Sequence, residues 1–235
     1  MTSDVIISIH IPKTGGQTLR KIVNQNYPKE CIFTCYPTNP RYSNFQDFVS
    51  MEKKERNKYR IFVGHVGFGT HELLQEPFSY FAMMREPVER VLSNYQHIIR
   101  NNPSFNGIQV SIAKFYESKR LLLDNFQTRM ISGMKPLFGQ CDENMYEKAL
   151  ENIEKYFSLV GLNEEFDKTV ELLADIYGWQ HTEQEKINIT PNKMHMEDLE
   201  DEDRELIVLY NSLDMKLYDE MVKQFSDRWT QHNAP

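Results

Sequence analysis

The chain has 235 residues, of which 40% are hydrophobic and 26% charged, values typical of a globular domain with a buried core. Lysine and arginine total 27 against 34 aspartate and glutamate residues, so the net charge is 27 − 34 = −7. This acidic balance argues against bulk binding of nucleic acid or of an anionic membrane. The length favours a single domain over residues 1–235.

The N-terminus has no basic leader, and the sequence contains no apolar run long enough for a membrane span. Three cysteines, Cys31, Cys35 and Cys141, are too few for a disulfide framework, and no second Cys/His pair follows at zinc-finger spacing. We therefore expect free thiols, no metal site and a cytoplasmic protein. A lumenal Golgi domain separated from its membrane anchor would show the same features, so this alternative stays open.

The first predicted element is a strand over residues 5–11, a β-branched apolar run that Pro12 ends. The residues that follow are Lys13, Thr14, Gly15, Gly16, Gln17 and Thr18, and a helix is predicted from Leu19. A strand, a glycine turn and a helix aim backbone N–H groups and a helix N-terminus at an anion. The lysine adds a positive charge and the threonines add hydroxyl donors. A tight turn without a ligand is the alternative.

Residues 20–58 are less regular. They predict a short strand over 31–36, a loop at the prolines that follow, a short helix over 45–51 and a solvated charge run over 52–58.

The second core strand is predicted over residues 60–64, and His65 follows it directly. The carboxyl ends of parallel strands are where open α/β sheets bind ligands. A histidine there, with an ordinary pKa of about 6.5, can accept a proton from a hydroxyl at neutral pH. The alternatives are that His65 only caps the loop, or that His71 is the base.

The third strand is predicted over residues 78–84, followed by Arg85 and by a helix over residues 88–100 with a core-facing apolar stripe. Ser93 lies about two helical turns beyond Arg85. A guanidinium and a hydroxyl at one strand end suit a phosphate. The alternative for Arg85 is a salt bridge to Glu86 or Glu89, and Arg90 is expected on the surface.

Further helices are predicted over 108–117, 144–156 and 166–177 and in the C-terminal region after residue 197, with a fourth core strand over 157–162 that ends at Asn163. Strands interleaved with helices predict the α/β class, with a central parallel sheet covered on both faces. The polar groups at the strand ends, Lys13 to Thr18, His65, Arg85 and Asn163, would then share one rim.

The order Pro-Lys-Thr-Gly-Gly at residues 12–16 resembles the 5′-phosphosulfate loop of sulfotransferases that use 3′-phosphoadenosine 5′-phosphosulfate (PAPS). The longer version, His-Ile-Pro-Lys-Thr-Gly-Gly, looks most like the carbohydrate type, the heparan sulfate 2-O and 6-O sulfotransferases and their bacterial relatives. The resemblance covers roughly residues 5–220. It implies a P-loop-like sulfotransferase fold, PAPS as co-substrate, 3′-phosphoadenosine 5′-phosphate (PAP) as product and no metal.

The resemblance also implies roles for individual residues. His65 would be the general base, Lys13 would stabilise charge on the bridging oxygen, and residues 14–18 would hold the 5′-phosphate. Arg85 and Ser93 would bind the 3′-phosphate. Thr190 and Lys193, in a loop that closes over the cofactor, and Gln127 and Arg129, near acceptor or cofactor, complete the predicted set. For the last pair, a polar helix end capped by Gly133 is an equal alternative.

Gln17 departs from the pattern, since relatives usually have threonine or serine there. One hydroxyl contact is lost, which would weaken donor binding by roughly 0.5–1.5 kcal/mol.

Two rival functions remain. A nucleotide kinase should carry GK[ST] after the glycines and a strand-end aspartate for Mg²⁺, and neither is present at the first or third strand. A non-catalytic binding module would keep the phosphate loop without needing His65. If the chain is a sulfotransferase, the resemblance implies a sugar hydroxyl as acceptor, and the acidic balance favours a small or weakly charged one. The oligomeric state stays open.

Overall fold

The computed structural model describes residues 4–36, 42–74, 77–101, 110–183 and 193–234. Five strands form one parallel sheet in the order β2-β3-β1-β4-β5. They are β1 (Val5–Ile9), β2 (Ile32–Cys35), β3 (Ile61–Gly64), β4 (Phe78–Met84) and β5 (Phe157–Leu162). This confirms the predicted parallel sheet and its strands, including the short one near residue 32. The central strand β1 is buried along its whole length, as an apolar run between two helical layers requires.

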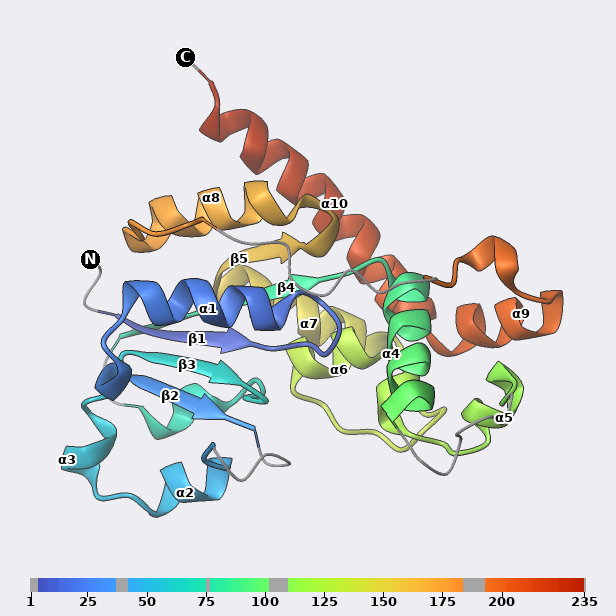
Figure 1. Cartoon of the computed structure of the whole chain (residues 1–235), viewed down its shortest axis with the longest axis horizontal. Coiled ribbons are helices and arrows are strands. Elements are labelled where there is room, and N and C mark those ends of the chain that lie inside the picture. Colours follow the sequence, from blue (N-terminus) through green and yellow to red (C-terminus); the bar gives the residue numbers. More distant parts are fainter. Residues whose placement is uncertain (1–3, 37–41, 75–76, 102–109, 184–192, 235) are drawn as a thin grey trace.

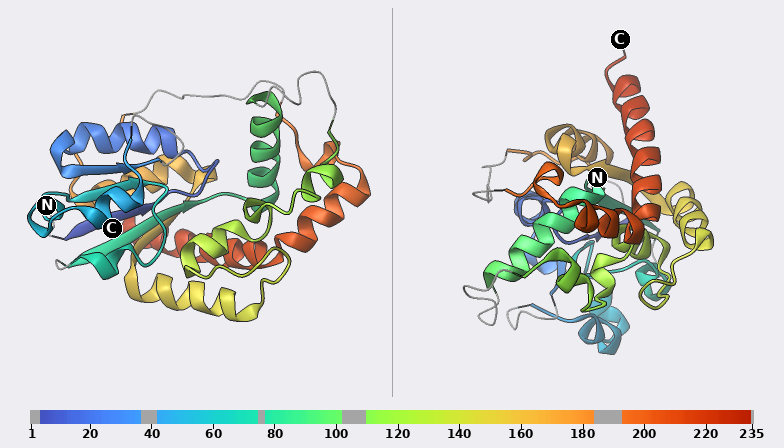
Figure 2. Two further views of the ribbon diagram at one scale, coloured as in Figure 1. Left: turned by 90° about the horizontal axis from the view of Figure 1, so that it is seen from below. Right: turned by 90° about the vertical axis from the view of Figure 1, so that its right-hand side faces the viewer.

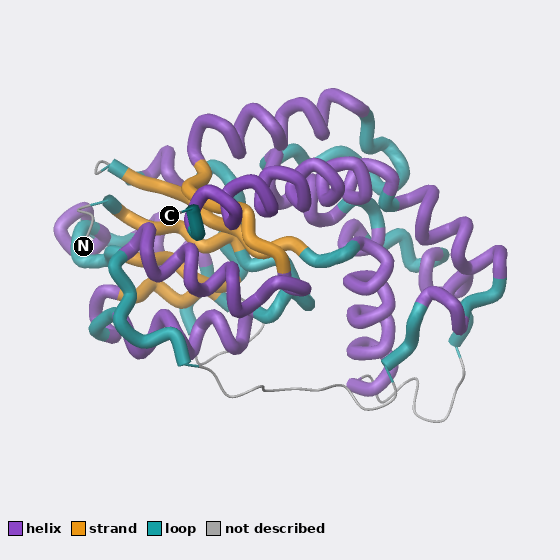
Figure 3. The backbone as a smooth tube through the Cα atoms, turned by 90° about the horizontal axis from the view of Figure 1, so that it is seen from above, coloured by secondary structure: helices purple, strands orange, loops and turns teal. Residues whose placement is uncertain are grey.

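Helices cover both faces of the sheet, as predicted (Figures 1 and 3). Their bounds are α1 (Gly16–Asn26), α2 (Phe45–Ser50), α3 (Lys53–Arg56), α4 (Pro87–Asn101), α5 (Ile112–Tyr116), α6 (Phe126–Ser132), α7 (Glu143–Tyr156), α8 (Phe166–Tyr177), α9 (Asp201–Tyr210) and α10 (Ser212–His232). Figure 2 shows α1 and α7 on opposite faces. Helices α1 and α8 lie side by side, because Gly15 abuts Phe166 at one end and Asn26 binds the backbone of Gln180 at the other.

The first helix begins three residues earlier than the sequence predicted. Gly15 takes a left-handed conformation, with φ of 79°, and serves as the N-cap, so that Gly16 is already helical. His71 lies in a 3₁₀ turn over Thr70–Leu73, and helix α5 covers Ile112–Tyr116 within the predicted helix over residues 108–117.

A second apolar cluster lies beyond the carboxyl ends of the strands. Its buried members come mainly from α4, α5 and α9: Val88, Val91, Leu92, Ile112, Phe115, Tyr116, Leu123, Leu199 and Ile207. In Figure 1 these helices stand at the side toward which the strand arrows point. Helix α4 therefore stands across the rim at which the sheet ends.

A buried polar cluster joins α4 to α6 and α10. Asp214 accepts hydrogen bonds from the backbone N–H groups of Gln127 (3.1 Å) and Thr128 (2.8 Å) at the start of α6. Its carboxylate also faces the Arg90 guanidinium at 3.9 Å, and Arg90 donates to the Leu122 carbonyl at 3.1 Å. Arg90 is fully buried. The expectation that Arg90 lies on the surface is therefore wrong, because α4 is covered on that side by α6 and α10.

Replacing Asp214 with asparagine should strongly destabilise the protein. The change leaves the Arg90 charge buried without a counter-charge, and we expect a loss of about 3 kcal/mol in the free energy of unfolding, measured with urea. Asp219→Asn, at an exposed position of the same helix, is the matched control and should change it by less than about 0.5 kcal/mol. Equal stabilities of the two variants would contradict the role given to this ion pair.

Candidate active site

The bend after β1 is held in a strained, closed form. Lys13 has a φ of 75°, which is unusual for a residue with a side chain and is found most often at functional sites. The Thr14 hydroxyl donates to the Ile11 carbonyl at 2.7 Å, so it closes the bend from within. Of the two threonine hydroxyls expected to face a phosphate, that of Thr14 is thus already used by the backbone.

The N-terminus of α1 is suited to an anion. Gly15 as N-cap supplies no capping side chain, and the first turn carries no acidic residue. With no carboxylate in this turn, the positive end of the helix dipole can attract an anionic ligand. Thr18 lies in this first turn and is half-buried, whereas Gln17 is exposed.

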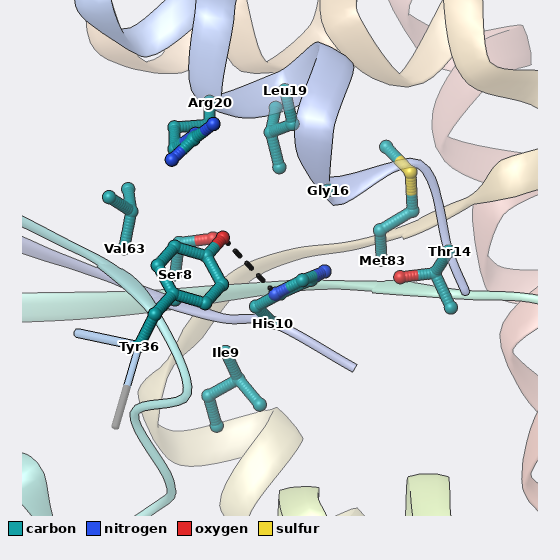
Figure 4. A pocket seen from close by; sticks show the side chains of 11 residues that line it. Ser8, Ile9, His10, Thr14, Gly16, Leu19, Arg20, Tyr36, Val63 and Met83 are labelled. Carbon is teal, nitrogen blue, oxygen red and sulfur yellow. Dashed lines mark hydrogen bonds between the residues drawn. The ribbon is translucent and has the colours of Figure 1, made fainter. Parts of the chain in front are cut away.

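Two histidines stack beside this helix end, and one of them, His10, lies in a pocket between Gly16 and Tyr36 (Figure 4). The rings of His10 and His65 lie 5.5 Å apart between centroids with 28° between their planes, and Tyr36 meets His65 edge-on at 5.0 Å. The Tyr36 hydroxyl lies 3.4 Å from Nδ1 of His10. Gly16 is needed here, since a Cβ at that position would lie 2.0 Å from Nε2 of His10. The ring of His10 thus fills the space between the bend and His65.

Both histidines are biased toward the neutral form. Burial, then the neighbouring His65 and Arg20, lowers the pKa of His10 to about 4. Burial also lowers the pKa of His65, although that residue keeps an exposed face. A neutral, accessible imidazole is what a general base requires at pH 7.

His71 is engaged elsewhere. Its backbone N–H and its Nδ1 both lie within 3.0 Å of the Tyr80 hydroxyl, and its ring stacks on Phe78 at 4.6 Å. The structure therefore favours His65 over His71 as the candidate base.

Arg85 lies against the bend. Its Nη1 donates to the Lys13 carbonyl at 3.2 Å, which connects the end of β4 to the turn after β1. The Gly15 position also lies against Asn163, since a Cβ there would be 3.1 Å from Oδ1 of that residue. The polar groups that follow β1, β3, β4 and β5 thus share one rim of the sheet, as the strand order predicts.

Positive charge is concentrated at this rim. The pKa of Lys13 is lowered by burial and then by the neighbouring charges of Arg85 and Arg100. The lowering of the pKa of Lys13 by its cationic neighbours indicates a local positive field for an anionic ligand, despite the negative charge of the whole chain.

Arg85 also makes the salt bridge considered as its alternative. Its Nη2 lies 3.1 Å from Oε2 of Glu89, and Nζ of Lys193 lies 2.7 Å from the same oxygen. Ser93 is half-buried one turn further along α4. Thr190 lies outside the described residues.

Gln127 and Arg129 are structural in this conformation. The Gln127 amide accepts from the Arg85 N–H at 3.0 Å and donates to the Arg85 carbonyl at 2.8 Å, so it fixes the backbone that carries the guanidinium. Four of the five N–H donors of Arg129 bind Asp124, Pro136 and Leu137, and its side chain is buried. Gly133 caps α6. The helix-end alternative therefore describes this segment better than acceptor contact does.

Sequence reasoning missed His10 and Arg100, and it gave Glu89 only as a possible salt-bridge partner of Arg85. The position of His10 at the carboxyl end of β1 was a usable signal, since it matches that of His65 after β3. Glu89 lies in the first turn of α4, four residues after Arg85, and this short separation was the signal for the pair.

Comparison with known proteins decides the family. The sequence pattern described as "Sulfotransferase family" matches residues 2–219. The chain belongs to the sulfotransferase family. The fold of this sulfotransferase is similar to that in "Crystal Structure of Sulfotransferase from Alicyclobacillus acidocaldarius", with a TM-score of 0.50 and 13% sequence identity over 94% of this chain and 96% of that one. A search of curated proteins returned no match.

Three further observations concern the described residues of this sulfotransferase. Within the described parts of the chain, no helix is both long and apolar enough to cross a membrane. The same residues contain no group of three or more His, Cys, Asp or Glu side chains placed to hold a metal ion. The cysteines Cys31, Cys35 and Cys141 are free thiols.

His10 should make the sulfotransferase less stable in acid. Because its pKa falls from the ordinary 6.5 to about 4 on folding, the unfolded chain binds more protons between these values. This part of the stability is intact above pH 6.5 and should be lost as pH drops toward 4, by about 2–3 kcal/mol.

The test compares urea unfolding at pH 7 and pH 4.5 for the wild type and His10→Gln. The variant should lose less stability on acidification than the wild type does. His181→Gln, at an exposed histidine, should keep the wild-type dependence. An unchanged dependence in His10→Gln would show that His10 is not buried in its neutral form.

Proposed function

We propose that this sulfotransferase transfers the sulfuryl group of PAPS to a hydroxyl of a carbohydrate acceptor, with His65 as general base. The observation that carries the proposal is the bond from Arg85 to the Lys13 carbonyl. It supports a single ligand held at both ends, with its 5′-phosphosulfate on the bend and its 3′-phosphate beside Arg85.

The donor site is assembled from complementary charges. N–H groups at the start of α1 and the Thr18 hydroxyl hold the 5′-phosphate, and Lys13 lies next to its bridging oxygen. Arg85 presents its guanidinium to the 3′-phosphate, with the Ser93 hydroxyl one turn beyond Glu89 on α4 and with Lys193 at the same Glu89 oxygen as Arg85. A 3′-phosphate is the feature that separates PAPS from ATP.

The chemical step is an in-line displacement at sulfur. The acceptor oxygen forms a bond to sulfur while the bond from sulfur to the 5′-phosphate oxygen breaks, and the electron pair stays on that oxygen. His65 accepts the proton of the acceptor hydroxyl, and Lys13 stabilises the charge that develops on the leaving oxygen. As in phosphoryl transfer, positioning and electrostatic stabilisation supply most of the rate.

The acceptor is expected to approach over His65. Tyr36 lies edge-on beside it and Tyr42 packs on Tyr36, 5.5 Å away between ring centroids, and a tyrosine ring has apolar faces and a polar hydroxyl. Such faces suit a sugar ring. The net charge of −7 favours a small or weakly charged sugar over a long polyanion.

PAP should raise the melting temperature of the sulfotransferase, whereas Mg·ATP should leave it nearly unchanged. A ligand at a hundred times its Kd stabilises the folded state by about 2.7 kcal/mol, which thermal shift detects easily. Arg85→Met should reduce the stabilisation by PAP more than that by adenosine 5′-monophosphate (AMP). Stabilisation by Mg·ATP alone would instead support a nucleotide kinase.

His65→Ala should keep PAP binding within about twofold and reduce transfer at least ~100-fold, since a general base contributes roughly 10²–10⁴ in rate. Transfer is followed with ³⁵S-labelled PAPS over a panel of sugars, lipids and phenols. In the wild type the rate should fall as pH drops below about 6.5, because the pKa of His65 lies below its ordinary value. His71→Asn is the control and should retain transfer. Full activity in His65→Ala would remove His65 from the mechanism.

A further inference from the structure

Glu89 occupies the centre of a cluster of basic side chains at the predicted 3′-phosphate site. Its Oε2 is 3.1 Å from Nη2 of Arg85 and 2.7 Å from Nζ of Lys193, and its Oε1 is 3.2 Å from Nδ1 of His195. The three partners come from the end of β4 and from the segment before α9. A single carboxylate on α4 is thus bound from several sides, as a bound phosphate would be.

The carboxylate is ionised at neutral pH. Partial burial alone would raise the pKa of Glu89, but the hydrogen bond and charge of Lys193, and then the charge of Arg85, hold it below its ordinary value. Glu89 therefore brings a full negative charge to the place where a second negative charge is expected.

Lys193 does not depend on Glu89 alone for its position. The next residue, Met194, donates its N–H to Oε1 of Gln96 at 3.3 Å, two turns along α4 from Glu89. The His195 N–H is bound by Asp198 at 2.8 Å. Removing the charge of Glu89 should therefore leave this segment against α4, with its ammonium free to bind another anion.

We propose that Glu89 is an internal competitor of the 3′-phosphate, which displaces its carboxylate from Arg85 and Lys193 when the nucleotide binds. This inference rests on the proposed function, because it assumes that a 3′-phosphate binds at Arg85. A phosphate dianion has more charge and more acceptor oxygens than a carboxylate, so Arg85 and Lys193 bind the phosphate in preference to Glu89. The displaced carboxylate of Glu89 stays near the bound 3′-phosphate and repels it electrostatically.

The consequence is a lowered affinity for the product. After transfer, PAP still carries the 3′-phosphate. The repulsion by Glu89 therefore increases the dissociation rate of PAP from the enzyme. A nucleotide without a 3′-phosphate, such as AMP, leaves the Glu89 contacts in place and is not affected. Glu89 therefore acts on one phosphate of the ligand rather than on nucleotide binding in general.

The test measures the Kd of PAP and of AMP by calorimetry, and the dissociation rate of PAP by stopped flow, for the wild type and Glu89→Gln. Loss of one like charge next to the phosphate should tighten PAP by about fivefold or more and slow its dissociation, with AMP within about twofold. Glu151→Gln removes the same charge from an exposed pair on α7 and should change neither Kd. Equal or weaker PAP binding in Glu89→Gln, with AMP unchanged, overturns the inference.

If Glu89→Gln misfolds and loses AMP binding, a second variant tests the competition between Glu89 and the 3′-phosphate. Lys193→Met should weaken PAP and leave AMP unchanged, because the ammonium is transferred to the 3′-phosphate. Equal effects on both nucleotides overturn the inference. If the wild type binds PAP no more tightly than AMP, both the proposed function and the role of Glu89 are overturned. If the wild type binds PAP more tightly than AMP and both variants keep the same ratio of the two Kd values, only the role of Glu89 is overturned.

Discussion

The hydrogen bond from the Arg85 guanidinium to the Lys13 carbonyl is the contact on which the account of this sulfotransferase depends. It connects the strained bend after β1 to the end of β4, two segments far apart in the sequence that parallel strand pairing brings to one rim. If the bend and Arg85 were far apart, each would bind a separate ligand. Because they are in contact, one ligand with two anionic ends can bind to the bend and to Arg85 at the same time.

Much of the remaining structure serves to hold Arg85 in place. The Gln127 amide pairs with both backbone groups of Arg85, and Asp214 in turn binds the start of α6, from which Gln127 projects. Arg90, one turn into α4, is buried against the same carboxylate. A chain of buried polar contacts thus runs from α10 through α6 to Arg85, and each member is costly to leave unpaired. The buried polar residues of α6 are explained by this support better than by contact with substrate.

The sheet and the polar groups along its carboxyl rim could be predicted from the sequence because they depend on local signals. Some residue patterns indicate the backbone conformation of the segment in which they occur. Here these patterns are the β-branched run before Pro12, the glycine pair after it and the polar residues at strand ends. Arg90 was placed wrongly because burial of a charge depends on a partner, Asp214, that lies 124 positions away and has no local signature. The structural role of Gln127 and the stacking of His10 on His65 likewise arise from contacts between distant segments.

The most direct measurement of the central claim is a crystal structure of the protein with PAP. The account predicts one nucleotide across the rim, with its 5′-phosphate on the N–H groups at the start of α1 and its 3′-phosphate on Arg85 and Ser93. A nucleotide that meets only one of these groups, with its other phosphate in solvent, would contradict it.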